Sequence, residues 1–177
     1  MCVIEKTPVI ETRRLALRAP ERRDAARLAD LANDFDIVRM TSRMPWPYGR
    51  KDAEAFIARC GQRDLSRDAT FLIEVDDEGV AGCLGFFTNP EGALEVGYWI
   101  GRDWWGRGIA TEALTGALAW AGRDWRKRCV TAGHFADNPV SGTVLVKSGF
   151  LYTGVTKMLD SLARGEPAPT KMMVWLA

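Results

Sequence analysis

Gly106 and Gly108 lie in a short loop that joins a strand-like segment to a helix-like one. Two glycines let such a turn take backbone conformations that other residues avoid, and they keep side chains away from a bound group. A helix that begins close to Gly108 would also place unpaired N–H groups and the positive end of its dipole at this point. The pattern predicts an anion site suited to a phosphate-bearing ligand. A tight turn with no ligand would need the same two glycines, so the pair alone does not decide between these interpretations.

Two familiar phosphate loops do not fit the sequence. A P-loop places a Lys-Ser or Lys-Thr pair after its final glycine, to reach the terminal phosphates and magnesium, but Gly108 is followed by Ile-Ala-Thr. A dinucleotide-binding turn needs a third glycine, which is missing here. The loop is therefore predicted to hold a phosphate without supplying metal or hydride chemistry.

Periodicity predicts the elements on either side of the loop. From residue 94 to residue 100 the side chains alternate, which indicates a strand. One face of that strand carries Leu94, Val96, Tyr98 and Ile100, and the other carries Glu95, Gly97 and Trp99. Beyond the loop, apolar residues recur at helical spacing from Ala110 to Trp125. Gly97, inside the strand, predicts a bulge or the close approach of a ligand.

At this point the sequence resembles a known family. The segment from Tyr98 to Leu114, with Trp-Gly-Arg-Gly-Ile-Ala-Thr-Glu-Ala at its centre, is similar to the acyl-CoA motif of the GNAT N-acetyltransferases. Among them, the branch with the ribosomal-protein-alanine N-acetyltransferases is the most similar. Residues 11–18, 138–141 and 147–150 carry further similarity to that branch, which extends from about residue 9 to the C-terminus. The resemblance implies an acyl-CoA N-acyltransferase fold, acetyl-CoA as co-substrate, no metal, and compatibility with a homodimer.

The resemblance also implies which residues surround acetyl-CoA. Its pyrophosphate would bind the main-chain amides of Trp105, Gly106, Arg107, Gly108, Ile109 and Ala110. The side chains of Arg102 and Arg107 would be free to add positive charge from the side. The strand would contribute Tyr98, Trp99 and Ile100, with the N–H of Trp99 or Ile100 facing the thioester oxygen. Asn138 would hydrogen-bond the pantetheine arm.

Acetyl transfer to a primary amine by direct attack needs a base, because the amine must lose a proton. Glu95 is the first candidate, since it lies on the strand face opposite the main apolar set, although a solvated charge would show the same pattern. His134 is the second, because histidines titrate near neutrality. A satisfied structural histidine explains His134 at least as well. Asp137 is the third candidate, and it could instead cap the helix that follows.

A departing thiolate needs at most a weak acid. By resemblance, the Ser141 hydroxyl would lie near the thioester sulfur and would help to protonate it. Tyr152 is a less favoured substitute. A serine in the first turn of a helix can also be a helix-terminus residue and nothing more.

Composition is consistent with such an enzyme. The 177 residues predict a single domain, 1–177, with one well-buried core. Lys and Arg total 24 against 23 Asp and Glu, so the charge predicts neither a nucleic-acid partner nor a membrane surface. The N-terminus lacks the basic-then-apolar order of a signal peptide, which favours a cytoplasmic protein. With one histidine and four scattered cysteines, no metal site is expected.

The fold class predicted from the remaining pattern is α/β, with a mixed, mainly antiparallel central sheet flanked by helices. The predicted strands are 13–19, 71–75, 80–87, 94–100, 129–135, 150–156 and 171–176. The predicted helices are 21–33, 51–63, 139–147 and the one that follows Gly108. Residues 35–48 and 161–169 are predicted to be irregular.

The acceptor amine is the least determined part of the prediction. Residues 35–48 are rich in Met, Trp, Pro and Tyr, and they are predicted to roof the acceptor pocket or to pack in the core. A protein N-terminal α-amine is the leading acceptor, and a small-molecule amine is the alternative. The segment 161–169 departs from peptide-modifying relatives and could close over the site. A module that senses acyl-CoA without turnover would need the loop and Asn138, but it would need none of Glu95, His134 and Ser141.

Overall fold

The computed structural model describes residues 7–177. Residues 1–6 lie outside this range. The predicted domain 1–177 and the prediction about a signal peptide therefore include residues that the structure does not describe. The described strands are β1 (Ile10–Glu11), β2 (Leu15–Arg18), β3 (Ala69–Val75), β4 (Gly79–Thr88), β5 (Leu94–Ile100), β6 (Cys129–Phe135), β7 (Leu151–Ser161) and β8 (Glu166–Leu176). The described α-helices are α1 (Ala25–Ala32), α2 (Phe35–Val38), α3 (Arg50–Cys60), α4 (Ile109–Arg123) and α5 (Pro139–Lys147). Single 3-10 turns, η1 (Arg22–Asp24) and η2 (Arg102–Trp104), precede α1 and the glycine loop.

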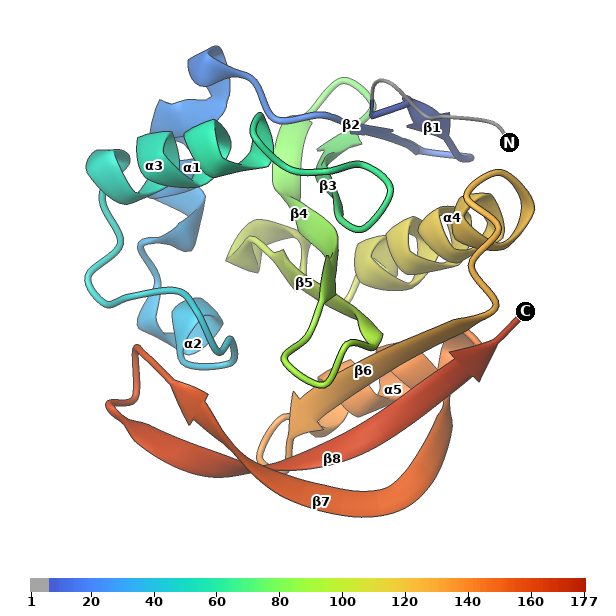
Figure 1. The fold of residues 1–177 in the computed structure, drawn as a ribbon. Coiled ribbons are helices and arrows are strands. Elements are labelled where there is room, and N and C mark those ends of the chain that lie inside the picture. Colours follow the sequence, from blue (N-terminus) through green and yellow to red (C-terminus); the bar gives the residue numbers. More distant parts are fainter. Residues whose placement is uncertain (1–6) are drawn as a thin grey trace.

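Within residues 7–177 the strands form one sheet in the order β1-β2-β3-β4-β5-β6-β8-β7 (Figure 1). Neighbouring strands run antiparallel except β5 and β6, which are parallel. The predicted mixed, mainly antiparallel sheet flanked by helices is therefore confirmed. The parallel pair requires a crossover connection, and α4 supplies it.

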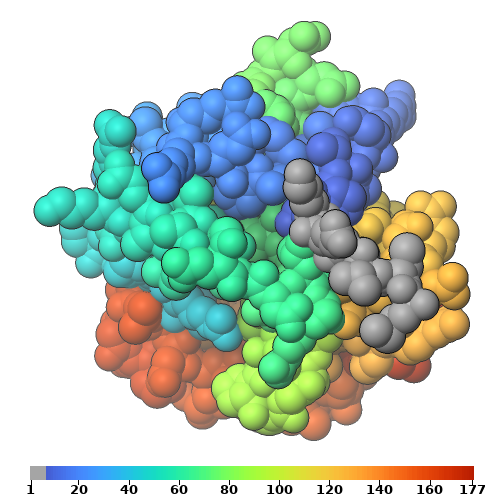
Figure 2. All heavy atoms as spheres, turned by 45° about the horizontal axis from the view of Figure 1, so that its top comes forward, coloured from blue at the N-terminus to red at the C-terminus, as the bar shows by residue number. Residues whose placement is uncertain are grey.

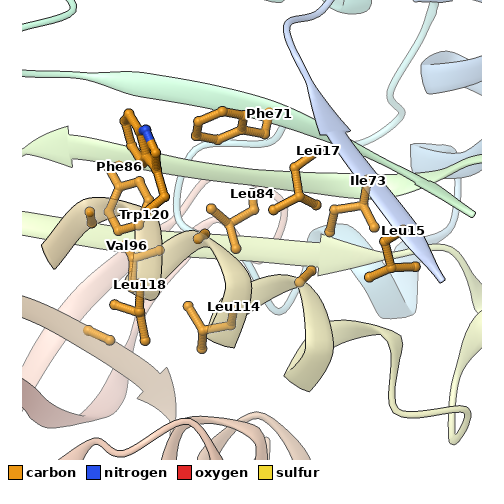
Figure 3. Packing of buried hydrophobic residues seen from close by; sticks show 14 of the residues in the cluster. Leu15, Leu17, Phe71, Ile73, Leu84, Phe86, Val96, Leu114, Leu118 and Trp120 are labelled. Carbon is orange, nitrogen blue, oxygen red and sulfur yellow. The ribbon is translucent and has the colours of Figure 1, made fainter. Parts of the chain in front are cut away.

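Helices cover both faces of the sheet, and alternate residues of each strand point to different helices. Phe71 and Ile73 of β3 pack in the core beneath α4, whereas Leu72 between them packs with α1 and α3. Figure 3 shows the α4 side, where Trp120 lies against Phe71 and Phe86. Both cores contact β5, which carries four of the predicted site residues, Glu95, Tyr98, Trp99 and Ile100.

Several predicted elements agree with the structure, and others differ. The predicted strands 94–100 and 129–135 and the helix 139–147 have the observed bounds. The first predicted strand is shorter, and the two-residue β1 precedes it. Residues 35–48 are not wholly irregular, because Asp34 caps the short helix α2 by accepting a hydrogen bond from the N–H of Asp36.

The largest difference is at residues 161–169, which are the end of β7, a four-residue turn at 162–165 and the start of β8 in a long hairpin, instead of a loop. Pro167 and Pro169 argue against a strand, because proline cannot donate to a ladder. In the structure Pro169 accepts a hydrogen bond from the N–H of Ala136, just past the end of β6. In an antiparallel strand, the N–H and the C=O of one residue point to the same edge of the strand. The nitrogens of Pro167 and Pro169 therefore face the edge of β8 beyond the end of β6, where no strand needs a donor. Within residues 7–177, none of the helices has the length and apolar character needed to cross a membrane.

Candidate active site

The site begins where the sheet opens between its two parallel strands. β5 and β6 pair only at Glu95 and Thr131, where the Thr131 hydroxyl also donates to the carbonyl of Leu94 at 3.1 Å. Beyond this point the strands diverge, as Figure 1 shows. The C-terminal half of β5, directly before the glycine loop, therefore has no strand partner on its β6 side, and this unpaired stretch between the two strand ends is called the opening below.

The main chain of β5 decides which groups face this opening. The N–H of Gly101 donates to the carbonyl of Ala81 in β4 at 2.8 Å, whereas the carbonyl of Ile100 points away and accepts from the Trp105 indole at 2.7 Å. Because the bonding side alternates along an antiparallel strand, the ladder with β4 uses the N–H of Trp99 and leaves that of Ile100 facing the opening. Of the two predicted oxyanion donors, only Ile100 is therefore available.

The glycine loop presents its N–H groups without partners. Gly106 and Gly108 have φ of 72° and 76°, in the left-handed region that glycine favours. A Cβ added at Gly106 would meet no atom within 4 Å, so the surface of the loop is open. Among the described residues, none of the N–H groups of residues 106–111 forms a hydrogen bond of normal geometry. Consecutive free donors at the start of the 15-residue helix α4 match the requirements of a diphosphate.

The two arginines beside the loop are not free, and that prediction is wrong. Arg102 donates to both carboxylate oxygens of Asp34, at 2.6 and 2.7 Å, and also to Asp36. Arg107 donates to both oxygens of Glu78, at 2.9 and 2.5 Å. The Arg102 guanidinium holds the pKa of the Asp34 carboxyl below its usual range. Carboxylates neutralise both side chains, so an anion at the loop depends mainly on main-chain donors.

Arg14, which no site prediction included, supports the loop from behind. Both terminal nitrogens of its guanidinium donate to the carbonyl of Arg107 at 3.2 Å, and its Nε donates to Glu112 of α4 at 2.8 Å. The N–H of Gly108 belongs to the same peptide group as that carbonyl, so it points away from Arg14. The block of residues 11–18 shared with the family was the available signal, but it gave Arg14 no role.

On the α5 side of the sheet, the structure brings Tyr98 and Ser141 together. The Tyr98 hydroxyl lies 2.9 Å from Ser141 Oγ and 3.1 Å from the Ser141 carbonyl. The side-chain oxygen of Asn138 accepts the N–H of Ser141 at 3.2 Å and caps α5, so the Asn138 NH₂ group remains available for a ligand. Burial raises the pKa of Tyr98 to about 12, which keeps its hydroxyl protonated at neutral pH.

Glu95 lies on the opposite face of the sheet. One carboxylate oxygen accepts a hydrogen bond from the Asn89 side chain at 3.1 Å, and the residue is partly exposed. Two positions along, Gly97 leaves room beside Phe87, whose ring lies under the Arg43 guanidinium at 4.3 Å. Glu95 and Ser141 therefore lie on different sides of the sheet near the opening between β5 and β6.

The structure argues against His134 as the base. The residue is 5% exposed, its Nδ1 donates to the Phe135 carbonyl at 3.0 Å, and its Nε2 accepts from the Tyr152 hydroxyl at 3.0 Å. Both ring nitrogens are thus occupied, on the α5 side of the sheet and away from Glu95. The hydroxyl of Tyr152, the less favoured candidate for the acid, is hydrogen-bonded to His134, and it is Tyr98 that lies against Ser141.

Asp137 is also a poor base, because arginines enclose its carboxylate. Arg164 donates to both of its oxygens at 2.9 Å, and Arg39 lies 3.4 Å from one of them. The same Arg164 donates through Nε to the Arg39 carbonyl at 2.6 Å, and the Ser161 hydroxyl donates to the carbonyl of Thr41. These contacts fasten the turn of the β7–β8 hairpin to the loop after α2, and Figure 2 shows the two segments side by side.

We expect Asp137→Asn to release this turn. Hydrogen bonds from Arg164 hold the pKa of Asp137 below 3.8, so the stabilisation is complete above about pH 4 and is lost as the pH falls through the lowered value. At pH 7 the variant should unfold with a free energy lower by about 1 kcal/mol and should be cut faster by trypsin after Arg164. The difference in unfolding free energy should disappear near pH 2. Asp160→Asn, an exposed carboxylate of β7, is the control, and equal behaviour of the two variants would contradict the expectation.

A cavity of about 420 Å³ lies beside Arg102, between the end of α1 and the start of η2. Phe35 and Trp46 line it, so part of the segment predicted to roof the acceptor pocket does border a cavity. Tyr48 packs in the core with α1 and α3 instead. Tyr48 therefore agrees with the interpretation that the segment packs in the core, and the role of the segment as the roof of the acceptor pocket stays a prediction.

Comparison with known proteins identifies the family of the chain. A family model described as "Acetyltransferase (GNAT) domain" matches residues 14–151. The [Ribosomal protein uS5]-alanine N-acetyltransferase of Escherichia coli (strain K12) is 29% identical over 161 residues, which is 84% of this chain and 80% of that protein. The structure of Mycobacterium smegmatis RimJ in complex with CoA-disulfide has a TM-score of 0.80 at 22% identity, over 92% of this chain and 82% of that one. RimL, a ribosomal L7/L12 alpha-N-protein acetyltransferase in complex with coenzyme A, has a TM-score of 0.81 at 21% identity, over 96% of this chain and 98% of that one. At these identities the two structures show the fold alone.

Proposed function

The chain belongs to the GNAT family and is an acetyltransferase, and from this premise we propose that it moves the acetyl group of acetyl-CoA to the N-terminal α-amine of a protein. The observation that carries the proposal is the run of free N–H groups at residues 106–111, directly beyond the opening between β5 and β6. A diphosphate bound there would direct the rest of the donor into the opening. Acetyl-CoA supplies an acetyl group activated as a thioester.

In this proposal Glu95 takes the proton of the attacking amine, directly or through a water. Its second carboxylate oxygen has no hydrogen-bond partner among the described residues, so it can accept a proton. The task is easier for an α-amine, with a pKa near ~8, than for a lysine side chain near ~10.4. The Glu95 carboxylate can deprotonate the amine with the lower pKa more easily, so an α-amine is the favoured acceptor.

Two further groups would act on the other side of the reacting carbonyl. The N–H of Ile100, which faces the opening, would donate to the oxygen as negative charge develops there. The Ser141 hydroxyl would donate to the departing sulfur. The NH₂ group of Asn138, free of the helix cap, would hold the pantetheine arm.

The proposed acceptor class also draws on similarity. The Escherichia coli relative is named for the acetylation of an alanine of ribosomal protein uS5, and the similarity covers most of both chains. On this ground we propose a small N-terminal residue such as alanine as the acceptor. We propose in addition that residues 1–177 act as one catalytic domain.

The test is release of free thiol from acetyl-CoA in the presence of a panel of amines. Peptides with an N-terminal alanine should give turnover, and the same peptides with an acetylated N-terminus should give none. Turnover only with a polyamine or an aminoglycoside would replace the proposed acceptor by a small-molecule amine. Tight binding of coenzyme A without turnover on any amine would favour a sensor of acyl-CoA and would reject the proposed reaction.

A further inference from the structure

The Tyr98 hydroxyl has one hydrogen, and two oxygen atoms of Ser141 lie close enough to accept it. The Tyr98 hydroxyl can donate either to the Ser141 carbonyl at 3.1 Å or to Ser141 Oγ at 2.9 Å. When it donates to the carbonyl, the short contact with Oγ requires the serine to donate to the tyrosine. When it donates to Oγ, the serine hydrogen is free to point elsewhere.

We propose that Tyr98 is a positioning residue, which donates to Ser141 Oγ and thereby directs the serine hydrogen to the sulfur of the acyl donor. This inference rests on the proposed function, because it assumes that the sulfur reaches Ser141. It adds a residue to the reaction and a reason for the serine to be an effective donor. A serine hydroxyl that receives one hydrogen bond is a better donor of the next one.

The surroundings of Tyr98 fit this role. Its side chain lies on the α5 face of β5, at the opening. Two residues further along the strand, the N–H of Ile100 also faces the opening. Among the described residues, no other side chain forms a hydrogen bond with Ser141 Oγ. Tyr152 cannot substitute for Tyr98, because its hydroxyl is bonded to His134.

The step balances without any further reactant. The amine nitrogen forms a bond to the acetyl carbon, the carbon–sulfur bond breaks, and its electron pair moves to sulfur. The amine proton passes to the base. The sulfur leaves as a thiolate that accepts a hydrogen bond from the Ser141 hydroxyl; Ser141 and Tyr98 both keep their protons, and the thiolate takes up a proton from water afterwards.

The sharpest test measures the pKa of the coenzyme A thiol in its complex with the protein, from the ultraviolet absorbance of the thiolate. A hydrogen bond from Ser141 favours the thiolate and lowers this pKa. We expect Ser141→Ala and Tyr98→Phe each to raise it by about one unit, and the double variant to raise it no more than Ser141→Ala does. Tyr152→Phe is the matched control, and it should leave the thiol pKa unchanged.

Two other measurements separate a positioning role from a structural one. The affinity for coenzyme A should stay within about threefold in Tyr98→Phe, because phenylalanine keeps the ring and the phosphate loop is untouched. In the same variant kcat for an accepted amine should fall about tenfold, with KM for acetyl-CoA little changed. A loss of affinity equal to the loss of kcat would indicate a packing role and would overturn the proposal.

Failure of this inference can be told apart from failure of the proposed function. Normal turnover with additive effects of the two substitutions on the thiol pKa, or with no effect of Tyr98→Phe, rejects the role of Tyr98 alone. Coupled effects on the thiol pKa without turnover on any amine reject the acetyl transfer, but they support the placement of Tyr98 and Ser141 at the sulfur.

Discussion

Replacing Gly106 with valine is expected to raise the dissociation constant for acetyl-CoA at least ~100-fold, which corresponds to about 2.7 kcal/mol. Gly106 has a φ of 72°, a conformation that a β-branched residue rarely adopts. The loop must therefore rotate, and its N–H groups turn away from the diphosphate. Hydrogen bonds to a charged group contribute about 1.5–3 kcal/mol each, so misdirecting one or two of them accounts for the loss.

The matched control is Gly154→Val. Gly154, in β7, has a φ of 80° and, like Gly106, no atom within 4 Å of an added Cβ. Both variants carry the same backbone strain, and both should unfold slightly more easily than the wild-type protein. Only Gly106→Val should lose affinity in a calorimetric titration. Equal affinity in the two variants would show that the loop does not hold the donor.

Replacing Glu95 with glutamine is expected to lower kcat about a thousandfold, the range typical for loss of a general base. Glutamine keeps the shape of the side chain and the hydrogen bond from Asn89, but it cannot accept a proton at neutral pH. The dissociation constant for coenzyme A should stay within about twofold, because Glu95 lies on the other face of the sheet from Ser141. Activity should be measured with the best amine of the panel.

Glu91→Gln controls for the loss of a negative charge in the same region. Glu91 lies in the turn between β4 and β5 and pairs with Lys157. Its replacement should leave kcat within about twofold. If Glu95→Gln retained most of the activity, Glu95 would not be the base.

Periodicity and end signals were enough to predict β5, β6 and α5 to the residue. Asn138 followed by Pro139 marks the start of α5, and Gly149 follows its end. Alternation on β5 correctly separated the Glu95 face from the Tyr98 face. These signals are local, and they predict the elements correctly because packing in the cores on both faces of the sheet favours the same elements.

Long-range partners were beyond such reasoning. Nothing local reveals that Arg102 meets Asp34, 68 positions away, or that Arg14 reaches the carbonyl of Arg107. For the same reason, Tyr98 could be placed on a face but not beside Ser141. The length of the β7–β8 hairpin was not predicted, because Pro167 and Pro169 lack an N–H and argue against a strand. Beyond the end of β6 no strand needs that N–H.

His134 shows why a chemically suitable residue can be a poor candidate. Its side-chain type fits proton transfer, but its place on β6 puts it on the α5 side, beneath Gly142. Two fixed hydrogen bonds then leave no ring nitrogen for an incoming amine. The type of a residue makes it a candidate for the base, but its position in the sheet decides whether it can reach the amine.

The central claim is that the main chain of residues 106–111 binds the diphosphate of the acyl donor. A crystal structure of the complex with coenzyme A tests it most directly. The claim predicts phosphate oxygens within about 2.7–3.2 Å of the N–H groups of Gly106, Gly108 and Ala110, with the pantetheine arm between β5 and β6. A diphosphate bound elsewhere, with these N–H groups turned to side chains of the protein, would contradict it.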